Sequence, residues 1–173
     1  MKLIEKYATY RFHKKLADTD RKPKVPASGE LKKVGVLWRP EEKDAYSYLR
    51  NHFSHSKVIF RNLCIYGKVS PPQANSNAVT KKDLNWMGLP VSVSVENFIE
   101  TEFDLLLNVS LQQNLILDYI TAMSRAKFKI GWSPVNENYF DLNINIGRKQ
   151  DAMYLARQQI FYLDQLNKTK TDE

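Results

Sequence analysis

Residues 103–132, FDLLLNVSLQQNLILDYITAMSRAKFKIGW, decide the fold of this 173-residue chain. Residues 103–109, which include three consecutive leucines at 105–107, predict a buried strand. The serine and glutamine at the two ends of 110–113 have the spacing of a capping box, in which both side chains satisfy unpaired N–H groups at a helix start. An apolar stripe at 111–126 predicts that helix, and residues 128–132 predict a second strand. We therefore expect a strand–helix–strand unit at the centre of the chain.

Strands and helices alternate on both sides of this unit. We expect a loop at 68–80, a short strand or turn at 81–90, strands at 31–38, 58–66 and 139–146, and helices at 1–16, 40–53, 95–100 and 150–167. Such alternation predicts a mostly parallel sheet with helices on both faces, joined by right-handed crossovers. The last strand alternates apolar and polar residues after a short connection, which indicates an antiparallel edge strand. The predicted fold class is α/β, a Rossmann-like three-layer domain with an N-terminal basic helix.

The sequence predicts one folded domain with an extension at each end. Residues 1–30 are expected to form a basic amphipathic helix and a proline-containing linker, and residues 31–168 a single α/β domain. Residues 169–173 form a tail that we expect to fray. No apolar run approaches the roughly 18 residues needed to span a bilayer, and the N-terminus lacks the apolar core of a secretory signal. We expect a cytoplasmic protein with no membrane span.

The positive charge of the chain is concentrated near its N-terminus. The net charge at pH 7 is +7, and residues 1–33, with ten basic and four acidic side chains, carry +6 of it. We define the basic arm as Lys2, Lys6, Arg11, Lys14, Lys15, Arg21, Lys22 and Lys24. One interpretation is a helix docked on the domain with a solvated lysine face, and the other is a helix that meets an acidic partner. We expect RNA or a ribonucleoprotein, or else an acidic protein, as that partner.

Aromatic and basic side chains outside the arm suit a nucleic-acid partner as well. The Trp-Met pair at 86–87 and the Tyr-Phe pair at 139–140 offer surfaces on which nucleobases stack, although aromatic side chains also build cores. Lys127 and Lys129 alternate with the apolar residues of the predicted strand at 128–132. Because successive side chains of a strand point to opposite faces, both lysines are expected on the face opposite Phe128 and Ile130. With Arg125, Arg148 and Lys149 they would extend the basic patch that the arm begins.

Several chemistries lack the residues that they require. The chain contains no glycine-rich dinucleotide fingerprint, no P-loop and no nucleophile elbow. Cys64 is the only cysteine, which excludes an intramolecular disulfide and a cysteine zinc site. His52 and His55 have a spacing that suits a metal ion, but no third ligand lies nearby in the sequence. We expect no catalytic residue, cofactor or metal, and we interpret the chain as a non-enzymatic binding or accessory protein.

A ligand crevice is expected at the carboxyl ends of the strands, where open parallel sheets bind small molecules. The candidate crevice residues are Arg39, Lys68, Asn108, Ser110, Gln112 and Trp132. An arginine near a helix N-terminus at Ser110 suits a phosphate or a carboxylate, although a simple cap and a surface charge explain the same residues. The alternative function is therefore a small enzyme, or an enzyme-derived domain, that binds a phosphorylated or nucleotide-sugar ligand in this crevice.

Three segments carry a resemblance to a known family. They are KKDLNWMG at 81–88, FDLLLNVS at 103–110 and SRAKFKIGW at 124–132, and they resemble a bacterial family of conserved proteins known only as a domain of unknown function. The more distinctive positions are Asp83, Trp86, Gly88, Asp104, Lys127 and Gly131. This resemblance implies a small cytoplasmic protein and implies no activity.

A second, shorter resemblance concerns the central stretch alone. The second and third of these segments are also similar to part of the heptosyltransferase-type glycosyltransferases, which implies a Rossmann-like half. Those enzymes need a further domain that binds the nucleotide-sugar donor, and we do not expect one within 173 residues.

Overall fold

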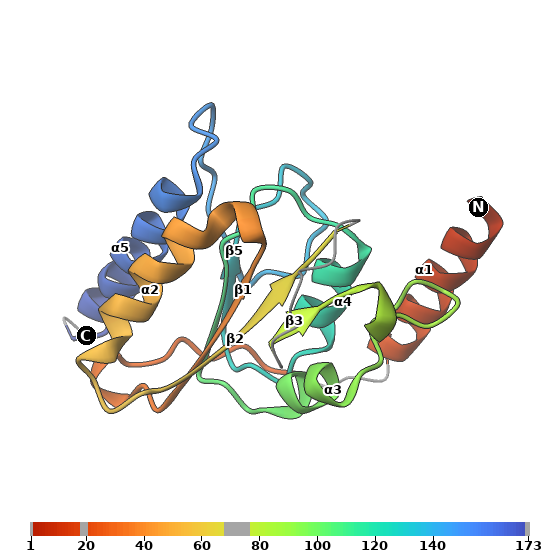
Figure 1. Ribbon diagram of the computed structural model, residues 1–173. Coiled ribbons are helices and arrows are strands. Elements are labelled where there is room, and N and C mark those ends of the chain that lie inside the picture. The colour runs from red at the N-terminus through yellow and green to blue at the C-terminus, as the bar shows by residue number, and fades with distance from the viewer. Residues whose placement is uncertain (1, 18–20, 68–76, 172–173) are drawn as a thin grey trace.

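The computed structural model describes residues 2–17, 21–67 and 77–171. They form a three-layer α/β fold, in which a six-stranded sheet lies between layers of helices (Figure 1). The strands are β1 (Lys33–Trp38), β2 (Ile59–Ile65), β3 (Ala78–Val79), β4 (Leu105–Asn108), β5 (Lys129–Gly131) and β6 (Leu142–Asn143). The helices are α1 (Lys2–Ala17), α2 (Lys43–Ser54), α3 (Val93–Glu100), α4 (Leu115–Met123) and α5 (Ala152–Thr171), with short 3-10 helices at Ser28–Glu30, Pro40–Glu42 and Lys81–Asp83.

The six strands are all parallel and lie in the order β3-β2-β1-β4-β5-β6. The chain builds outward from β1 to β3, crosses to the other side of β1, and then continues from β4 to β6. The strand order therefore reverses between β1 and β4, where Val36 pairs with Leu107. This topology confirms the predicted Rossmann-like domain and puts the switch point, where open sheets bind ligands, at the carboxyl ends of β1 and β4.

Alternate side chains of the strands fill two separate cores. Leu105 and Leu107 pack with α2 and α5, whereas Leu106 packs with α3 and α4. Figure 1 shows α2 and α5 together on one side of the sheet, with α3 and α4 on the other side and α1 outside α4. Gly35 leaves room for the Phe103 ring, since a Cβ at Gly35 would lie 2.9 Å from that ring. The strand predicted from the central apolar run is confirmed, and every residue of β4 is buried.

The antiparallel edge strand predicted at 139–146 is wrong. Only Leu142–Asn143 form a strand, β6, and it runs parallel to β5. The connection between the two strands folds back over β5, and Phe140 packs against Gly131, where a Cβ would lie 2.3 Å from the ring. The chain therefore re-enters the sheet at the same end as β5, which makes β6 parallel. The alternating residues that follow bury Ile144 and Ile146 in the core shared with α5.

The helix predicted at 111–126 begins later than its capping signal suggests. Asn114 is the N-cap of α4, and its Oδ1 accepts a hydrogen bond from Leu117 N at 3.0 Å. Ser110 lies before the helix, and its Oγ donates to Glu42 at 3.0 Å. The predicted capping box is therefore wrong, because a carboxylate from a distant part of the chain takes the serine hydroxyl.

Two short elements occur where the sequence predicts a loop and an undefined turn. β3 extends the sheet by pairing Ala78 with Cys64, although it was expected to be loop. After Lys81–Asp83, an isolated antiparallel bridge joins Leu84 to Pro90 and closes a turn. This turn projects from the α3 and α4 side of the sheet toward α1 (Figure 1).

Candidate functional site

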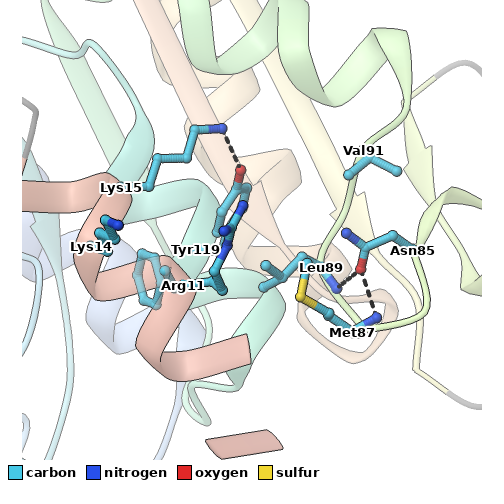
Figure 2. Close-up of a pocket in the computed structure, with 9 residues that line it drawn as sticks. Arg11, Lys14, Lys15, Asn85, Met87, Leu89, Val91 and Tyr119 are labelled. Atoms are coloured by element: carbon cyan, nitrogen blue, oxygen red, sulfur yellow. Dashed lines mark hydrogen bonds between the residues drawn. The ribbon is translucent and has the colours of Figure 1, made fainter. Parts of the chain in front are cut away.

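Figure 2 shows a groove between α1, α4 and the turn at 85–91. We call this cavity, whose volume is about 340 Å³, the α1 groove. Its lining consists of Arg11, Phe12, Lys14 and Lys15 from α1, Asn85, Met87, Leu89 and Val91 from the turn, and Tyr119 from α4. The groove therefore has one wall that carries cations of the basic arm and one wall that is mainly apolar.

α1 is held on the domain by its apolar face. Phe12 is only 2% exposed, and its ring centroid lies 5.5 Å from that of Tyr119 and 5.4 Å from that of Tyr139. Burial of one phenylalanine side chain stabilises such a contact by about 2 kcal/mol. Arg11 and Lys14 remain exposed on the same helix. The helix of the basic arm is thus docked, while its cations line an open groove.

The opposite wall is shaped by one asparagine. Asn85 Oδ1 accepts hydrogen bonds from Met87 N at 2.9 Å and from Leu89 N at 3.1 Å (Figure 2). Trp86 follows Asn85 in this turn, and 70% of the residue is exposed to solvent. The Trp86 ring stacks on Tyr7 of α1, with the centroids 5.9 Å apart. An exposed aromatic pair therefore lies beside the basic wall.

The α1 groove is electrostatically one-sided. None of the described residues that line it is acidic. Within the described ranges, the ion pairs include neither Arg11 nor Lys14. Lys15 Nζ donates to the Tyr119 hydroxyl at 3.2 Å, so this lysine reaches from α1 to α4 (Figure 2). Among the described side chains that line this groove, an anionic ligand would meet cations.

A larger cavity, of about 740 Å³, adjoins the α1 groove and shares Lys15, Val91 and Tyr119 with it. Its charged lining residues are Lys15, Arg21, Lys22, Arg125, Lys127, Glu96, Glu100 and Glu102. Arg125 pairs with Glu100 at 3.0 Å, and both side chains are more than half exposed. Because the charges of this cavity are mixed, an anion is favoured in the α1 groove rather than here.

The remaining residues of the basic arm are divided between anchors and exposed side chains. Arg21 Nε donates to Ala126 O at 2.7 Å, and its guanidinium forms an ion pair with Asp141. The backbone N–H of Lys24 donates to Lys127 O at 2.8 Å. The exposed side chains are those of Lys6, Lys22 and Lys24, and the side chain of Lys2 lies outside the described part of the chain.

The switch-point crevice between β1 and β4 is filled by a carboxylate that sequence reasoning missed. Glu42 is 5% exposed. Its Oε1 accepts hydrogen bonds from Ser110 Oγ at 3.0 Å and Leu111 N at 3.1 Å, and its Oε2 accepts one from Arg39 N at 2.8 Å. Burial raises the pKa of Glu42 from its ordinary value, although the hydrogen bonds and the Arg39 charge act in the opposite direction. The donors predicted to grip an anion are thus occupied by the protein itself.

The other predicted crevice residues build the surrounding hydrogen-bond network. Asn108 is fully buried, and its Nδ2 donates to Gln113 Oε1 at 3.0 Å, while Gln113 Nε2 donates to Trp132 O at 3.2 Å. Gln112 is exposed, and only its backbone carbonyl joins the network, by accepting from Ser110 Oγ at 3.2 Å. The guanidinium of Arg39 pairs with Glu41 at 2.6 Å. Lys68 lies outside the described residues.

One half-buried and one buried titratable group lie on the side of α4 near α1 and Tyr139, and we call this region the α4 flank. Asp118 is half-buried, and burial raises its pKa to about 6. Lys129 was predicted on the exposed face with Lys127, and this is wrong, because Lys129 is 2% exposed and its Nζ donates to Ala122 O at 3.0 Å. Burial lowers the pKa of Lys129 to about 7, helped by the Arg21 charge and opposed by Asp141.

A cavity of about 270 Å³ opens on the α4 flank beside Lys129. It is lined by Leu16, Arg21, Ala122, Lys129, Asn138, Tyr139, Phe140 and Asp141. Lys127, two residues earlier, is exposed and pairs with Asp104 at 2.7 Å, which raises its pKa. Alternation along a strand could not reveal this difference, because the connection at 133–141 covers one lysine and leaves the other in solvent.

Metal binding and membrane insertion find no support in the described ranges. No group of three or more His, Cys, Asp or Glu side chains in them could hold a metal ion. Burial raises the pKa of Cys64 to about 12, so this thiol is a poor ligand and a poor nucleophile at pH 7. None of the described helices has the length and apolar character that a bilayer span requires.

Comparison with known proteins gives one match. A model of a family of unknown function (DUF6913) matches residues 5–166, which includes most of α1 and the whole sheet. Neither the curated proteins nor the solved structures searched give a match to this chain.

Proposed function

This chain belongs to the family of unknown function (DUF6913), which assigns it no activity, and we propose that it is a non-enzymatic binding protein whose α1 groove holds RNA. A single observation carries the proposal: three cations of α1 line a groove whose described residues include no acidic one, beside the exposed Trp86–Tyr7 pair. Cations attract the phosphate backbone, and aromatic faces stack with unpaired bases. This combination favours single-stranded RNA over an acidic protein, which has no bases to stack.

The crevice supports the alternative function less well. A phosphate or nucleotide-sugar ligand at the switch point would need the N–H and hydroxyl donors of Arg39, Ser110 and Leu111, and these already bind Glu42. Displacing Glu42 would leave a buried carboxylate without donors, next to an anion. We therefore base the proposal on the α1 groove. The family resemblance implies that the protein acts in a bacterial cytoplasm.

The test compares two pairs of cations with equal charge. Arg11→Gln combined with Lys14→Gln removes two groove cations, whereas Lys43→Gln combined with Arg50→Gln removes two exposed cations of α2, on the other side of the sheet. Binding of a labelled single-stranded RNA is measured by fluorescence anisotropy between 50 and 200 mM salt, a range in which phosphate contacts dominate.

We expect the groove variant to weaken RNA binding about tenfold and to lower the slope of log affinity against log salt by about 1.4, as two lost phosphate contacts require. The α2 variant should bind as the unchanged protein does. Equal weakening by the two variants, or an unchanged protein that fails to bind RNA, would contradict the proposal. Point substitutions are used because removing α1 would uncover the buried contacts of Phe12.

A further inference from the structure

The ε-amino group of Lys129 has too few partners for an ammonium ion. Its only hydrogen bond within the described ranges goes to Ala122 O at 3.0 Å, near the end of α4. The ion pairs of those ranges do not include Lys129. An ammonium group has three donors, and a buried ammonium that lacks acceptors and a counter-charge is strongly disfavoured. A neutral amine needs fewer acceptors and keeps a lone pair.

The nearest carboxylate does not neutralise this amine. Asp141 Oδ1 accepts from Arg21 Nη1 at 2.9 Å, and its Oδ2 accepts from Arg21 Nη2 and from the backbone N–H of Lys129 at 2.8 Å. Both carboxylate oxygens are thus engaged by groups other than Lys129 Nζ. The adjacent Arg21 charge disfavours a second cation, and together with burial it lowers the pKa of Lys129 to about 7. The neutral amine is therefore much more populated near pH 7 than in an ordinary lysine.

A cavity also adjoins Lys129. The cavity of about 270 Å³ on the α4 flank includes Lys129 in its wall, together with the aromatic residues Tyr139 and Phe140 and the amide of Asn138. Its charged residues, Arg21 and Asp141, neutralise each other. This lining suits a small uncharged molecule with one polar atom better than it suits an anion.

We propose that Lys129 is a covalent binding site for small uncharged aldehydes, which its ε-amino group captures as an imine. The nitrogen lone pair attacks the carbonyl carbon, a C–N bond forms, and the π electrons of the carbonyl move to its oxygen. The carbinolamine then loses the former carbonyl oxygen as water, which takes both protons of the amine, and a C=N bond remains. Amine and aldehyde give imine and water, with no change in oxidation state. The site does not depend on the α1 groove or on RNA.

Lys127 provides a matched control within the same molecule. It lies two residues away, is exposed, and is bound to Asp104, which raises its pKa. At pH 7 a lysine with an ordinary pKa is neutral in roughly 0.04% of molecules, so the two lysines differ by about three orders of magnitude in reactive amine. Burial of Lys129 slows access and reduces that advantage, and we expect Lys129 to react at least about tenfold faster than Lys127.

The experiment exposes the folded full-length protein to low millimolar propanal and sodium cyanoborohydride at pH 7. The hydride reduces each imine to a stable secondary amine, and peptide mass mapping over time gives the labelling rate of each lysine. We expect Lys129 to be labelled before the other lysines, and we expect the difference in rate between Lys129 and Lys127 to disappear in urea. The Lys129→Met variant should lose only the fast phase of lysine labelling. Labelling of Lys129 at or below the rate of Lys127 in the folded protein would overturn the proposal, as would a fast phase that survives in Lys129→Met.

Discussion

The switch-point crevice and the α4 flank both contain charged groups removed from solvent, but the number of hydrogen bonds made by these groups differs between the two regions. In the crevice, the carboxylate of Glu42 accepts hydrogen bonds from three donors of two chain segments. On the α4 flank, Lys129 Nζ has one acceptor, and the carboxylate of Asp118 has no hydrogen bond or ion pair within the described ranges. A buried charge with a full set of hydrogen bonds leaves no donors or acceptors for a ligand. A buried charge with few hydrogen bonds indicates a region where a ligand could still bind.

The largest expected effect on stability concerns the switch-point crevice. Glu42→Ala removes the acceptor of the Arg39 and Leu111 N–H groups and one of the two acceptors of Ser110 Oγ, and we expect it to lower the free energy of unfolding by about 3 kcal/mol. The control is Glu41→Ala, whose side chain is 56% exposed and pairs only with Arg39, so its loss should stay below about 1 kcal/mol. Urea denaturation of both variants measures the difference. Similar losses would mean that the crevice donors find other partners, and the contrast between the two regions would fail.

Asp118→Asn should have the opposite sign. The pKa of Asp118 is raised from 3.8 to about 6, so the folded state binds a proton more tightly than the unfolded state, and the ionised carboxylate destabilises the fold above pH 6. Solvent reaches this half-buried group, so we expect removal of the charge to stabilise the protein by about 2 kcal/mol at pH 7. The gain should shrink as the pH falls from 6 and disappear below about pH 4. Urea denaturation at pH 7 and pH 4 measures it, and Asp164→Asn, at an exposed aspartate, is the control for removal of one negative charge.

Asn114→Ala tests the helix that separates the two regions. Loss of the side-chain cap at the start of α4 should cost about 1 kcal/mol, while Asn114→Asp, which retains an acceptor for Leu117 N, should cost much less. Thermal unfolding of both variants provides the measurement. A cost of equal size for the two variants would show that the cap contributes little.

The smallest effect is expected in the α1 groove. Trp86 is 70% exposed, and we expect Trp86→Ala to change the free energy of unfolding by less than about 0.5 kcal/mol. Trp38 is the matched control, because its ring stacks on Tyr46 at 4.3 Å and its Nε1 donates to Asn62 at 3.0 Å. Trp38→Ala should cost more than 2 kcal/mol in the same denaturation assay. A large cost at Trp86 would make the aromatic pair a structural feature rather than a binding surface.

The parts of the fold that the sequence predicts are those whose signal is local. Three consecutive leucines at 105–107 are sufficient to identify β4, because a central parallel strand is buried on both faces. β3 and β6 have two residues each, and their neighbours in the sheet define them more than their own composition does. The direction of β6 depends on the packing of Phe140 against Gly131, which no alternation of residues reveals.

The candidate sites, like the fold, could be predicted from the sequence only where their signal is local. The basic wall of the α1 groove follows from charge counting, and Arg39, Asn108 and Ser110 do lie at the switch point. The carboxylate that fills the crevice was missed, since Glu42 and Ser110 are 68 residues apart and meet only after the sheet forms. Lys129 was misplaced because its burial depends on a connection that follows it in the chain.

The docking of α1 on α4 has a consequence during synthesis. Lys15 and its partner Tyr119 are 104 residues apart, and Phe12 packs against the same tyrosine. At a translation rate of roughly 5 to 20 residues per second, α1 leaves the ribosome roughly 5 to 20 seconds before its docking surface is made. During that interval α1 lacks the surface that Tyr119 provides in the folded protein, so the first contacts of this helix differ from those that hold it on the domain.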